Sequence, residues 1–199
     1  MTRCLVVVDV QNDFCPGGAL GVAGGDEVAA ATSALLAREG IAYEHVVATQ
    51  DFHIDPGAHF SETPDFVDSW PPHCRAGSYG ALLHDALDTR RIEAVFRKGQ
   101  YTAAYSGFEG TTSTVTAEGG EFVTGLADWL RGRGVDEVHV VGIATDHCVR
   151  ATALDAAREG FTTTVLLGLT AGISAQTTGA ALEELRGAGV ALVGEPVVG

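Results

Sequence analysis

The sequence predicts an α/β fold with three αβα layers, in which a mostly parallel sheet lies between flanking helices. Short β-branched apolar runs alternate along the chain with Ala- and Leu-rich segments of helical periodicity. The apolar runs are continuous rather than alternating, as expected for strands that are covered on both faces. Such strands, alternating with helices, are typical of a doubly wound parallel sheet. The length of 199 residues suits a single domain that spans residues 1–199.

The expected elements follow in chain order from these patterns. Six runs are expected to be strands: Leu5–Val10, His45–Thr49, Ala94–Arg97, Glu137–Gly142, Thr163–Leu167 and Val190–Val193. Four segments are expected to be helices: Asp26–Glu39, Glu121–Arg133, Asp146–Glu159 and Ala175–Arg186. Glycines follow them where a helix C-cap commonly takes a positive φ: Gly40, Gly134, Gly160 and Gly187. Two stretches, Phe52–Thr89 and Gly107–Gly120, are expected to be long loops, which in compact domains are usually functional or mobile.

The charge balance argues against two classes of partner. The chain has 12 Lys and Arg residues against 26 Asp and Glu residues, a formal net charge of −14 at pH 7. A nucleic-acid-binding protein needs a concentrated basic face to neutralise phosphates. An anionic membrane surface would repel a chain of this charge. The sequence therefore predicts neither a nucleic-acid nor a membrane partner. Lys98 is the only lysine, and every other basic residue is an arginine.

The N-terminus and the cysteines indicate a cytoplasmic location. Met1–Leu5 leads directly into an apolar strand pattern, without the apolar segment and small-residue cleavage site of a signal peptide. No apolar stretch approaches the roughly 20 residues of a membrane-spanning helix. Four widely spaced cysteines, without a CxxC pair, are expected to be reduced thiols: Cys4, Cys15, Cys74 and Cys148.

Reactive residue types follow the expected strands. Asp9 ends the first strand, Asp51 and His53 follow the second, Lys98 follows the third, and Cys148 follows the fourth. Ligands bind at the carboxyl ends of the strands in open parallel sheets. The sequence therefore predicts that an acid, a metal-type pair, the lone lysine and a cysteine meet at one edge of the sheet.

Cys148 is a candidate nucleophile, because it lies at the opening of a helix, where free N–H groups and the helix dipole favour a thiolate. The alternative is a buried structural thiol. His147 is adjacent in sequence but is not expected to face Cys148, so Asp9 is the better candidate base. Asp9 could instead cap a turn, and Lys98 could be a surface lysine at a strand end. A lysine in an otherwise arginine-only chain favours a need for a compact ammonium.

A second constellation combines one carboxylate with three imidazoles. Asp51 and His53 lie two residues apart at a strand end and therefore on one face, while His59 and His73 follow in the long loop. This ligand set suits one divalent ion such as Zn, Mn or Fe. Scattered loop histidines and a turn aspartate are the alternative. Cys74 is a weaker ligand candidate, because adjacent residues rarely share an ion.

Aromatic residues flank these polar groups and could form the walls of a site for a flat substrate. They are Phe14, Trp70, Tyr101 and Tyr105. Ordinary packing is the alternative for each. Trp129, within an expected helix, is predicted to be a core residue.

These motifs resemble the bacterial nicotinamidase/pyrazinamidase family of isochorismatase-like cysteine hydrolases. The resemblance covers nearly the whole chain and rests on these segments: Val6–Phe14, Gly17–Leu20, Thr49–Phe60, Ser69–Cys74, Phe96–Gly110 and Gly142–Gly160. It implies a six-stranded parallel sheet with flanking helices. It also implies deamidation of nicotinamide to nicotinate and ammonia, with pyrazinamide as an accepted analogue, in NAD salvage.

The resemblance also implies a role for each matching residue. Cys148 would attack the amide carbon, and Asp9 would take the thiol proton and pass it to the leaving ammonia. Lys98 would hold Cys148 and Asp9 in position. Backbone N–H groups of Ala144 and Cys148 would form the oxyanion hole, next to a cis peptide between Ile143 and Ala144. The implied metal ligands are Asp51, His53, His59 and His73. The implied residues around the substrate ring are Phe14, Leu20, Trp70, Tyr105, Ile143 and His147.

The segment Thr111–Glu121 departs from the family pattern, because it is longer than the usual loop there, and it could affect a lid or a subunit contact. Both a monomer and a homo-oligomer are compatible with the sequence. Three other functions compete with the implied one. The chain could hydrolyse another small amide or carbamoyl compound, act as a metal-hydroxide hydrolase with a structural Cys148, or bind a metal or a partner without catalysis.

Overall fold

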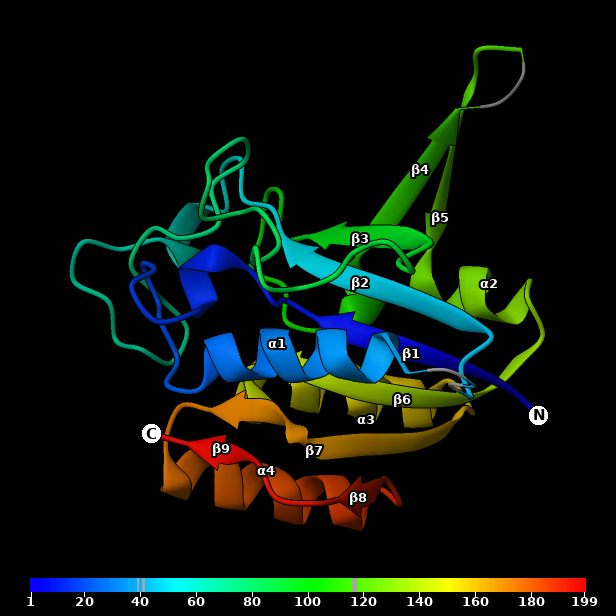
Figure 1. Ribbon diagram of the computed structural model, residues 1–199. Coiled ribbons are helices and arrows are strands. Elements are labelled where there is room, and N and C mark those ends of the chain that lie inside the picture. Colours follow the sequence, from blue (N-terminus) through cyan, green and yellow to red (C-terminus); the bar gives the residue numbers. More distant parts are fainter. Residues whose placement is uncertain (39, 41, 116–117) are drawn as a thin grey trace.

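The computed structural model describes residues 1–38, 40, 42–115 and 118–199, and its centre is a nine-stranded sheet (Figure 1). The strand order is β5-β4-β3-β2-β1-β6-β7-β8, with β9 paired to β7. The strands are β1 (Thr2–Val8), β2 (His45–Asp51), β3 (Ala94–Lys98), β4 (Thr111–Val115), β5 (Glu121–Gly125), β6 (Val135–Ile143), β7 (Thr162–Gly172), β8 (Ala191–Val193) and β9 (Val197–Val198).

The six expected strands are confirmed as β1, β2, β3, β6, β7 and β8, and neighbouring strands among them pair in parallel. The predicted count of six is too low, since β4, β5 and β9 also join the sheet. Two of these three additions form an antiparallel hairpin. The sheet is therefore mostly, but not wholly, parallel.

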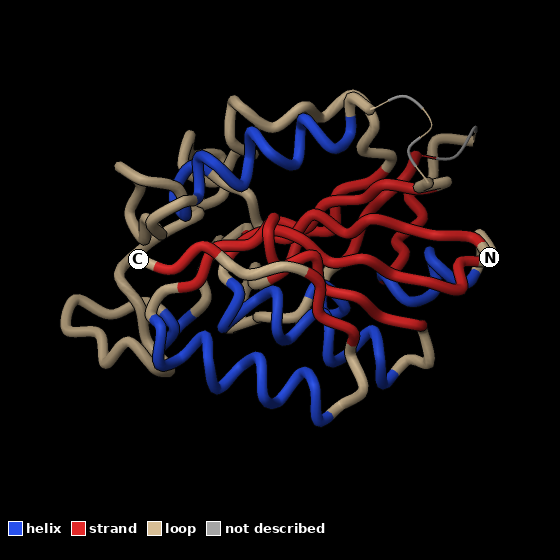
Figure 2. The backbone as a smooth tube through the Cα atoms, turned by 60° about the horizontal axis from the view of Figure 1, so that its bottom comes forward, coloured by secondary structure: helices blue, strands red, loops and turns tan. Residues whose placement is uncertain are grey.

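Helices cover both faces of the sheet, which gives the three expected layers (Figure 2). Helix α1 (Gly25–Leu36) lies on one face, and α2 (Leu126–Arg131), α3 (Arg150–Arg158) and α4 (Ala175–Gly187) lie on the other. Strand β1 shows why its sequence is continuously apolar. Its Leu5 and Val7 pack into the core beneath α1, whereas Cys4, Val6 and Val8 pack into the core beneath the other three helices.

The region after Gly107 differs from the prediction. The expected helix Glu121–Arg133 is wrong over its first five residues, because Glu121–Gly125 is strand β5 and only Leu126–Arg131 is helical. The expected loop likewise contains β4, which pairs antiparallel with β5 from Thr111↔Gly125 to Val115↔Glu121. Thr and Val, which favour strands, make up four of the five residues of β4 (TTSTV) but only two of the five in β5 (EFVTG). The hairpin projects away from the rest of the sheet (Figure 1).

The other helix boundaries are close to expectation. Helix α1 ends at Leu36, and the predicted end at Glu39 lies outside the described residues. Gly40, Gly134 and Gly160 have positive φ as expected. Gly187 does not, because it is the last residue of α4, and Gly189 takes the positive φ instead. A π-helical turn, Thr145–Val149, precedes α3 within the predicted helix Asp146–Glu159.

One glycine permits the close approach of two central strands. Gly142, near the end of β6, has a φ of 118°, and a Cβ atom there would lie 2.0 Å from the carbonyl oxygen of Val8. A side chain at this position would therefore push β6 away from β1, just before the turn that carries Cys148. Among the described residues, no helix is both long and apolar enough to cross a membrane.

Candidate active site

The carboxyl ends of four neighbouring strands bring the predicted reactive residues together. Strands β3, β2, β1 and β6 are adjacent in the sheet. Lys98 ends β3, Asp51 ends β2, Asp9 follows β1, and Cys148 lies in the π-helical turn after β6. The sequence-based prediction that these side chains meet at one edge is confirmed by their mutual distances.

Lys98 is the centre of this cluster. Its Nζ lies 2.8 Å from Asp9 Oδ2 and 3.6 Å from Cys148 Sγ. It also forms an ion pair with Asp51 Oδ1 and donates a hydrogen bond to the carbonyl of Ala104 at 3.2 Å. The lysine is wholly buried, so the surface interpretation is excluded. The two carboxylates hold the pKa of Lys98 well above its usual range, although burial opposes this shift.

Asp9 is a buried carboxylate with a left-handed backbone. Its φ is 48° and its side chain is wholly buried. Burial is the main cause that raises the pKa of Asp9, while the charge of Lys98 and a hydrogen bond from Thr49 oppose it. Thr49 Oγ1 donates that bond to Asp9 Oδ1 at 2.5 Å. A carboxylate with a raised pKa is a stronger base than an exposed one.

Cys148 lies at the start of the helical segment but is a neutral thiol at rest. Burial raises its pKa well above the usual value, and this effect outweighs the lowering by Lys98. The expectation that the helix start favours a thiolate is therefore not met in this state. Desolvation of the thiolate dominates, so a proton acceptor beside the sulfur is needed. The peptide between Ile143 and Ala144 is cis, as the resemblance implies.

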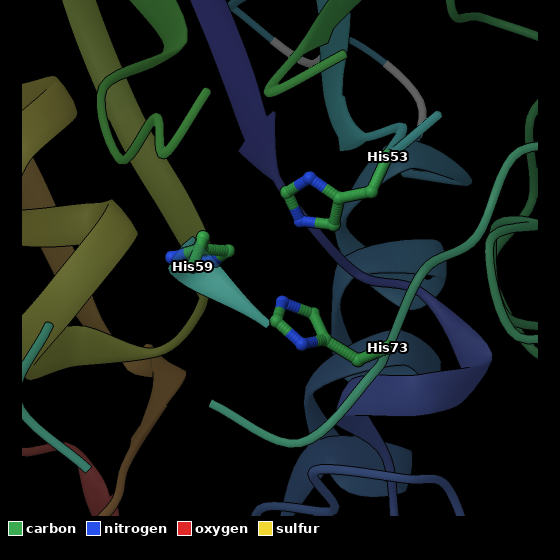
Figure 3. Close-up of side chains that lie close together, drawn as sticks. All are labelled: His53, His59 and His73. Carbon is green, nitrogen blue, oxygen red and sulfur yellow. The ribbon is translucent and has the colours of Figure 1, made fainter. Parts of the chain in front are cut away.

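Three buried imidazoles form a cluster beside this group, and Figure 3 shows that their side chains lie close together. His53, His59 and His73 each offer a nitrogen, and the three atoms lie within 4.8 Å of one another. Nδ1 of His53 donates to the carbonyl of Gly99 at 2.6 Å, and Nδ1 of His73 donates to that of Pro71 at 2.8 Å. These bonds leave both Nε2 lone pairs free, as metal ligation requires.

The cluster fits a divalent metal ion. Asp51 Oδ2 lies 3.6 Å from His53 Nε2 and 3.8 Å from His73 Nε2. His53 Nε2 and His59 Nδ1 are buried and have no hydrogen-bond partner among the described residues. Burial and the neighbouring imidazoles lower the pKa of His59 to about 4, so its ring is neutral at pH 7. Neutral imidazoles with one carboxylate are ligands of borderline divalent ions.

Cys74 is not part of this ligand cluster among the described residues. Burial raises the pKa of its thiol far above the usual value, which opposes the thiolate form that binds metals. Its backbone N–H donates to Asp13 Oδ2 at 2.7 Å, and its carbonyl accepts from His53 N at 3.0 Å. The residue therefore supports the loop that carries His73.

A cavity of about 330 Å³ connects His59 and His73 of the imidazole cluster with Cys148. Its lining includes all the ring-binding residues implied by the resemblance: Phe14, Leu20, Trp70, Tyr105, Ile143 and His147. Tyr101 is 70% exposed and is not part of the lining, so that prediction is wrong. Trp129 is a core residue, as predicted.

The cavity walls are flat and aromatic. Trp70 Nε1 donates a hydrogen bond to the Tyr105 hydroxyl at 3.0 Å. The His147 ring packs edge-on against Trp70, with 5.3 Å between ring centroids. Rings held in this way suit a planar substrate that stacks between them.

Sequence reasoning missed several residues of the site. Ala19, Gly21, Val22, Phe66 and Ile173 also line the cavity and come from loops that only the fold brings together. Ala144, which was expected at the oxyanion hole, lines the cavity too. Thr49 and Gln11 were also missed. The Gln11 amide donates a hydrogen bond to the carbonyl of Asp51 at 2.9 Å and accepts one from its backbone N–H at 2.8 Å. The sequence signal that could have identified Gln11 is its position between an apolar strand and a loop.

Asp146 is a further residue that the sequence analysis did not single out. It is buried, accepts hydrogen bonds from the backbone N–H of Ile173 and from the Thr177 hydroxyl, and lies 3.4 Å from His147 Nδ1. Although burial raises it, hydrogen bonds from these partners lower the pKa of Asp146 to about 2 overall. The carboxylate thus ties the Cys148 turn to the segment between β7 and α4.

Comparison with known proteins agrees with this geometry. Residues 3–195 match the Isochorismatase domain family. The nicotinamidase/pyrazinamidase of Mycobacterium tuberculosis is 63% identical over 191 residues, which cover 96% of this chain and 98% of that protein. The nicotinamidase of Escherichia coli is 37% identical over 206 residues, with 96% and 93% covered.

Two solved structures have the same fold. PnC1 from L. infantum, in complex with nicotinate, has a TM-score of 0.82 at 38% identity and covers 100% of this chain and 96% of its own. The pyrazinamidase of Pyrococcus horikoshii, in complex with zinc, has a TM-score of 0.78 at 34% identity, with 97% and 99% covered. The chain therefore belongs to the isochorismatase family.

Proposed function

We propose that this chain is a nicotinamidase that hydrolyses nicotinamide to nicotinate and ammonia, with pyrazinamide as a second substrate. The observation that carries the proposal is one continuous cavity, with aromatic side chains in its walls, that joins Cys148 to His59 and His73 of the imidazole cluster. A carboxamide at the sulfur and a planar ring toward the imidazoles would fill it. Relatives with nicotinamidase and pyrazinamidase names, and a related structure that contains nicotinate, support this substrate class.

The first chemical step is thiol activation. Asp9 takes the proton of Cys148, and the sulfur attacks the amide carbon. Lys98 stabilises the negative charge as it moves from the carboxylate to the sulfur, because its ammonium contacts both groups. The new oxyanion is expected to accept hydrogen bonds from the backbone N–H groups of Ala144 and Cys148.

The second part of the reaction releases the products. Protonated Asp9 gives its proton to the amide nitrogen, the carbon–nitrogen bond breaks, and ammonia leaves a thioester on Cys148. Water then gives a proton to Asp9 and attacks the thioester carbon. Collapse of this intermediate breaks the carbon–sulfur bond, returns the proton to the sulfur and frees the carboxylic acid. One acid–base residue thus serves both halves of the reaction.

The metal ligands in this proposal are Asp51, His53, His59 and His73. When bound, a divalent ion would act as a Lewis acid for the ring nitrogen of the substrate and so orient the ring. Zn, Fe and Mn all suit this donor set, and the zinc in a related pyrazinamidase structure supports the first of them. The protein's own contribution is to fix the imidazoles through Gly99 and Pro71.

We also propose a cytoplasmic enzyme whose product enters NAD salvage. The four cysteines are free thiols, which suits a reducing compartment. The substrate is a neutral amide, so the negative charge of the chain neither attracts nor repels it.

An ammonia-release assay tests the proposal. The purified enzyme should release ammonia from nicotinamide, and Cys148→Ala should lose all measurable turnover. Cys4→Ala, a thiol in the core away from the cavity, should retain activity and serves as the matched control. Iodoacetamide should inactivate the wild type at Cys148. Full activity of an alkylated enzyme would instead favour a metal-hydroxide hydrolase, and activity only toward other small amides would change the substrate.

A further inference from the structure

A second group of metal-ligating side chains lies outside the imidazole cluster. Cys15, Asp26 and His84 each offer one ligand atom, and these atoms lie within 4.8 Å of one another. Cys15 follows the 3-10 turn Asn12–Phe14, Asp26 lies in the first turn of α1, and His84 belongs to the long loop after β2. None of them has a part in the proposed reaction. We infer that these three side chains form a second divalent-metal site that is suited to Zn²⁺.

The ligand types and spacing fit this ion. A thiol, an imidazole and a carboxylate are the three ligand groups that zinc uses in proteins. His84 Nε2 lies 3.5 Å from Asp26 Oδ1. Two ligand atoms of one tetrahedral zinc ion, with bonds of about 2.0–2.3 Å, are roughly 3.3–3.7 Å apart. The nitrogen and oxygen therefore already have the spacing of two such ligands, and a water molecule would complete four-coordination.

The burial of the three residues shapes a site that an ion can reach. Cys15 is only 1% exposed, so solvent does not reach the site from the side of its sulfur. The side chains of Asp26 and His84 are 53% and 21% exposed. The sulfur of Cys15 is therefore the buried ligand of the site, and Asp26 and His84 are the ligands nearer the surface. The net negative charge of the chain raises the local concentration of cations near this solvent-accessible site.

Binding of an ion changes which atoms of the site carry protons. A metal ion binds the thiolate form of cysteine, so an ion that binds Cys15 Sγ displaces the proton of the thiol. His84 Nδ1 accepts a hydrogen bond from Ala86 N at 3.2 Å, which leaves the Nε2 proton directed at Asp26. Ligation through Nε2 requires the tautomer with its proton on Nδ1, so binding of the ion would give up the hydrogen bond from Ala86 N–H.

The site would also brace one wall of the catalytic cavity. Cys15 and Asp26 lie on either side of the loop 16–24, whose residues Ala19–Val22 line that cavity. A hydrogen bond from Val22 N to the carbonyl of Phe14, at 3.0 Å, ties this loop to the preceding 3-10 turn. A metal ion bound by both Cys15 and Asp26 would link the two ends of this loop and so limit its motion.

Metal counting tests the inference without an activity readout. The full chain is dialysed against Zn²⁺, and the bound metal is measured by mass spectrometry. The wild type should hold two ions per chain. Asp26→Asn and Cys15→Ala should hold one, with the second ion weakened by roughly tenfold or more, since even an outer-shell partner contributes about that much. Glu27→Gln, an exposed neighbour in the same helical turn, is the matched control and should hold two.

Cobalt distinguishes this site from the imidazole cluster. Co²⁺ bound to a thiolate gives a sulfur-to-metal charge-transfer band, whereas the imidazole cluster offers only nitrogen and oxygen. The band should disappear in Cys15→Ala and persist in His59→Ala and Cys148→Ala. A single zinc ion in the wild type, or a second ion that persists in Asp26→Asn, would overturn the inference. Because Asp26 is exposed, that variant is expected to fold.

Discussion

Lys98 Nζ and Asp9 Oδ2 form an ion pair at 2.8 Å, and neither side chain is exposed to solvent. The same ammonium pairs with Asp51, so two buried carboxylates share one cation. One negative charge is left over in a region of low dielectric, where an uncompensated charge is costly. A divalent ion on Asp51 would compensate it. The lysine thus links the acid–base residue to the metal ligands through electrostatics.

Lys98→Arg should reduce kcat/KM by roughly 10²–10³-fold, although the formal charge is unchanged. The planar guanidinium is larger than the ammonium and cannot contact two carboxylates and a sulfur from the same position. Steady-state kinetics on nicotinamide measure the effect. Arg97→Lys, at the exposed neighbouring position, should leave kcat/KM unchanged. Near-normal activity of Lys98→Arg would show that the lone lysine has no catalytic significance.

Thr49→Val should move the acidic limb of the pH profile of kcat/KM toward higher pH. Thr49 Oγ1 donates a hydrogen bond to Asp9 at 2.5 Å, and this bond lowers the pKa of the carboxyl. Its loss stabilises the protonated acid, so a higher pH is needed to generate the base. Valine has a similar shape, so packing is kept. An unshifted limb with reduced activity would indicate a purely structural threonine.

Asp146→Asn should destabilise the protein in a pH-dependent way. Hydrogen bonds lower the pKa of Asp146 to about 2 in the folded protein, against about 3.9 in the unfolded chain. This difference contributes about 3 kcal/mol of stability above pH ~5, and the contribution is lost as pH falls from about 4 toward about 2.

Urea unfolding at several pH values measures this effect. The difference in unfolding free energy between wild type and Asp146→Asn should be largest near pH 7 and should shrink at low pH. Asp155→Asn, which removes an exposed ion pair with Arg158, should change stability by less than about 0.5 kcal/mol. A difference independent of pH would show that the charge of Asp146 is not responsible.

His59→Ala should lower the affinity for the ion in the imidazole cluster by about tenfold or more, since a direct ligand is lost. His45→Ala is the control, because His45 pairs with Glu93 away from the cavity. Activity of His59→Ala should fall with its metal content and recover partly at high metal concentration. Wild-type metal content in this variant would exclude His59 as a ligand.

The sequence predicted the parallel core and the meeting of the reactive residues, because both follow from local patterns. Continuous apolar runs report burial on two faces, and a parallel sheet places their carboxyl ends at one edge. The hairpin of β4 and β5 was missed. Phe122 and Val123 lie between Glu121 and a genuine helix at Leu126, and the strand state is decided by pairing with Thr111–Val115 rather than by local preference.

The remaining features that the sequence did not predict depend on contacts between residues far apart in the chain. Thr49 and Asp146 are polar residues next to strand ends, and only the fold shows which groups they contact. The resting protonation of Cys148 also depends on three-dimensional burial, which outweighs the helix start that the sequence revealed.

The four neighbouring strands that supply Asp9, Asp51, Lys98 and Cys148 are joined by parallel pairing, with long stretches of chain between them. During synthesis on the ribosome, β1, β2 and β3 emerge first and are neighbours in the sheet, so Asp9, Asp51 and Lys98 can meet before the rest of the site exists. Its nucleophile is made after its acid and its lysine, and all three meet only when β6 docks beside β1. Distant pairings of this kind form late and slowly. Appearance of turnover would thus report completion of the central sheet, and an amidase assay on refolding protein would serve as a clock for that event.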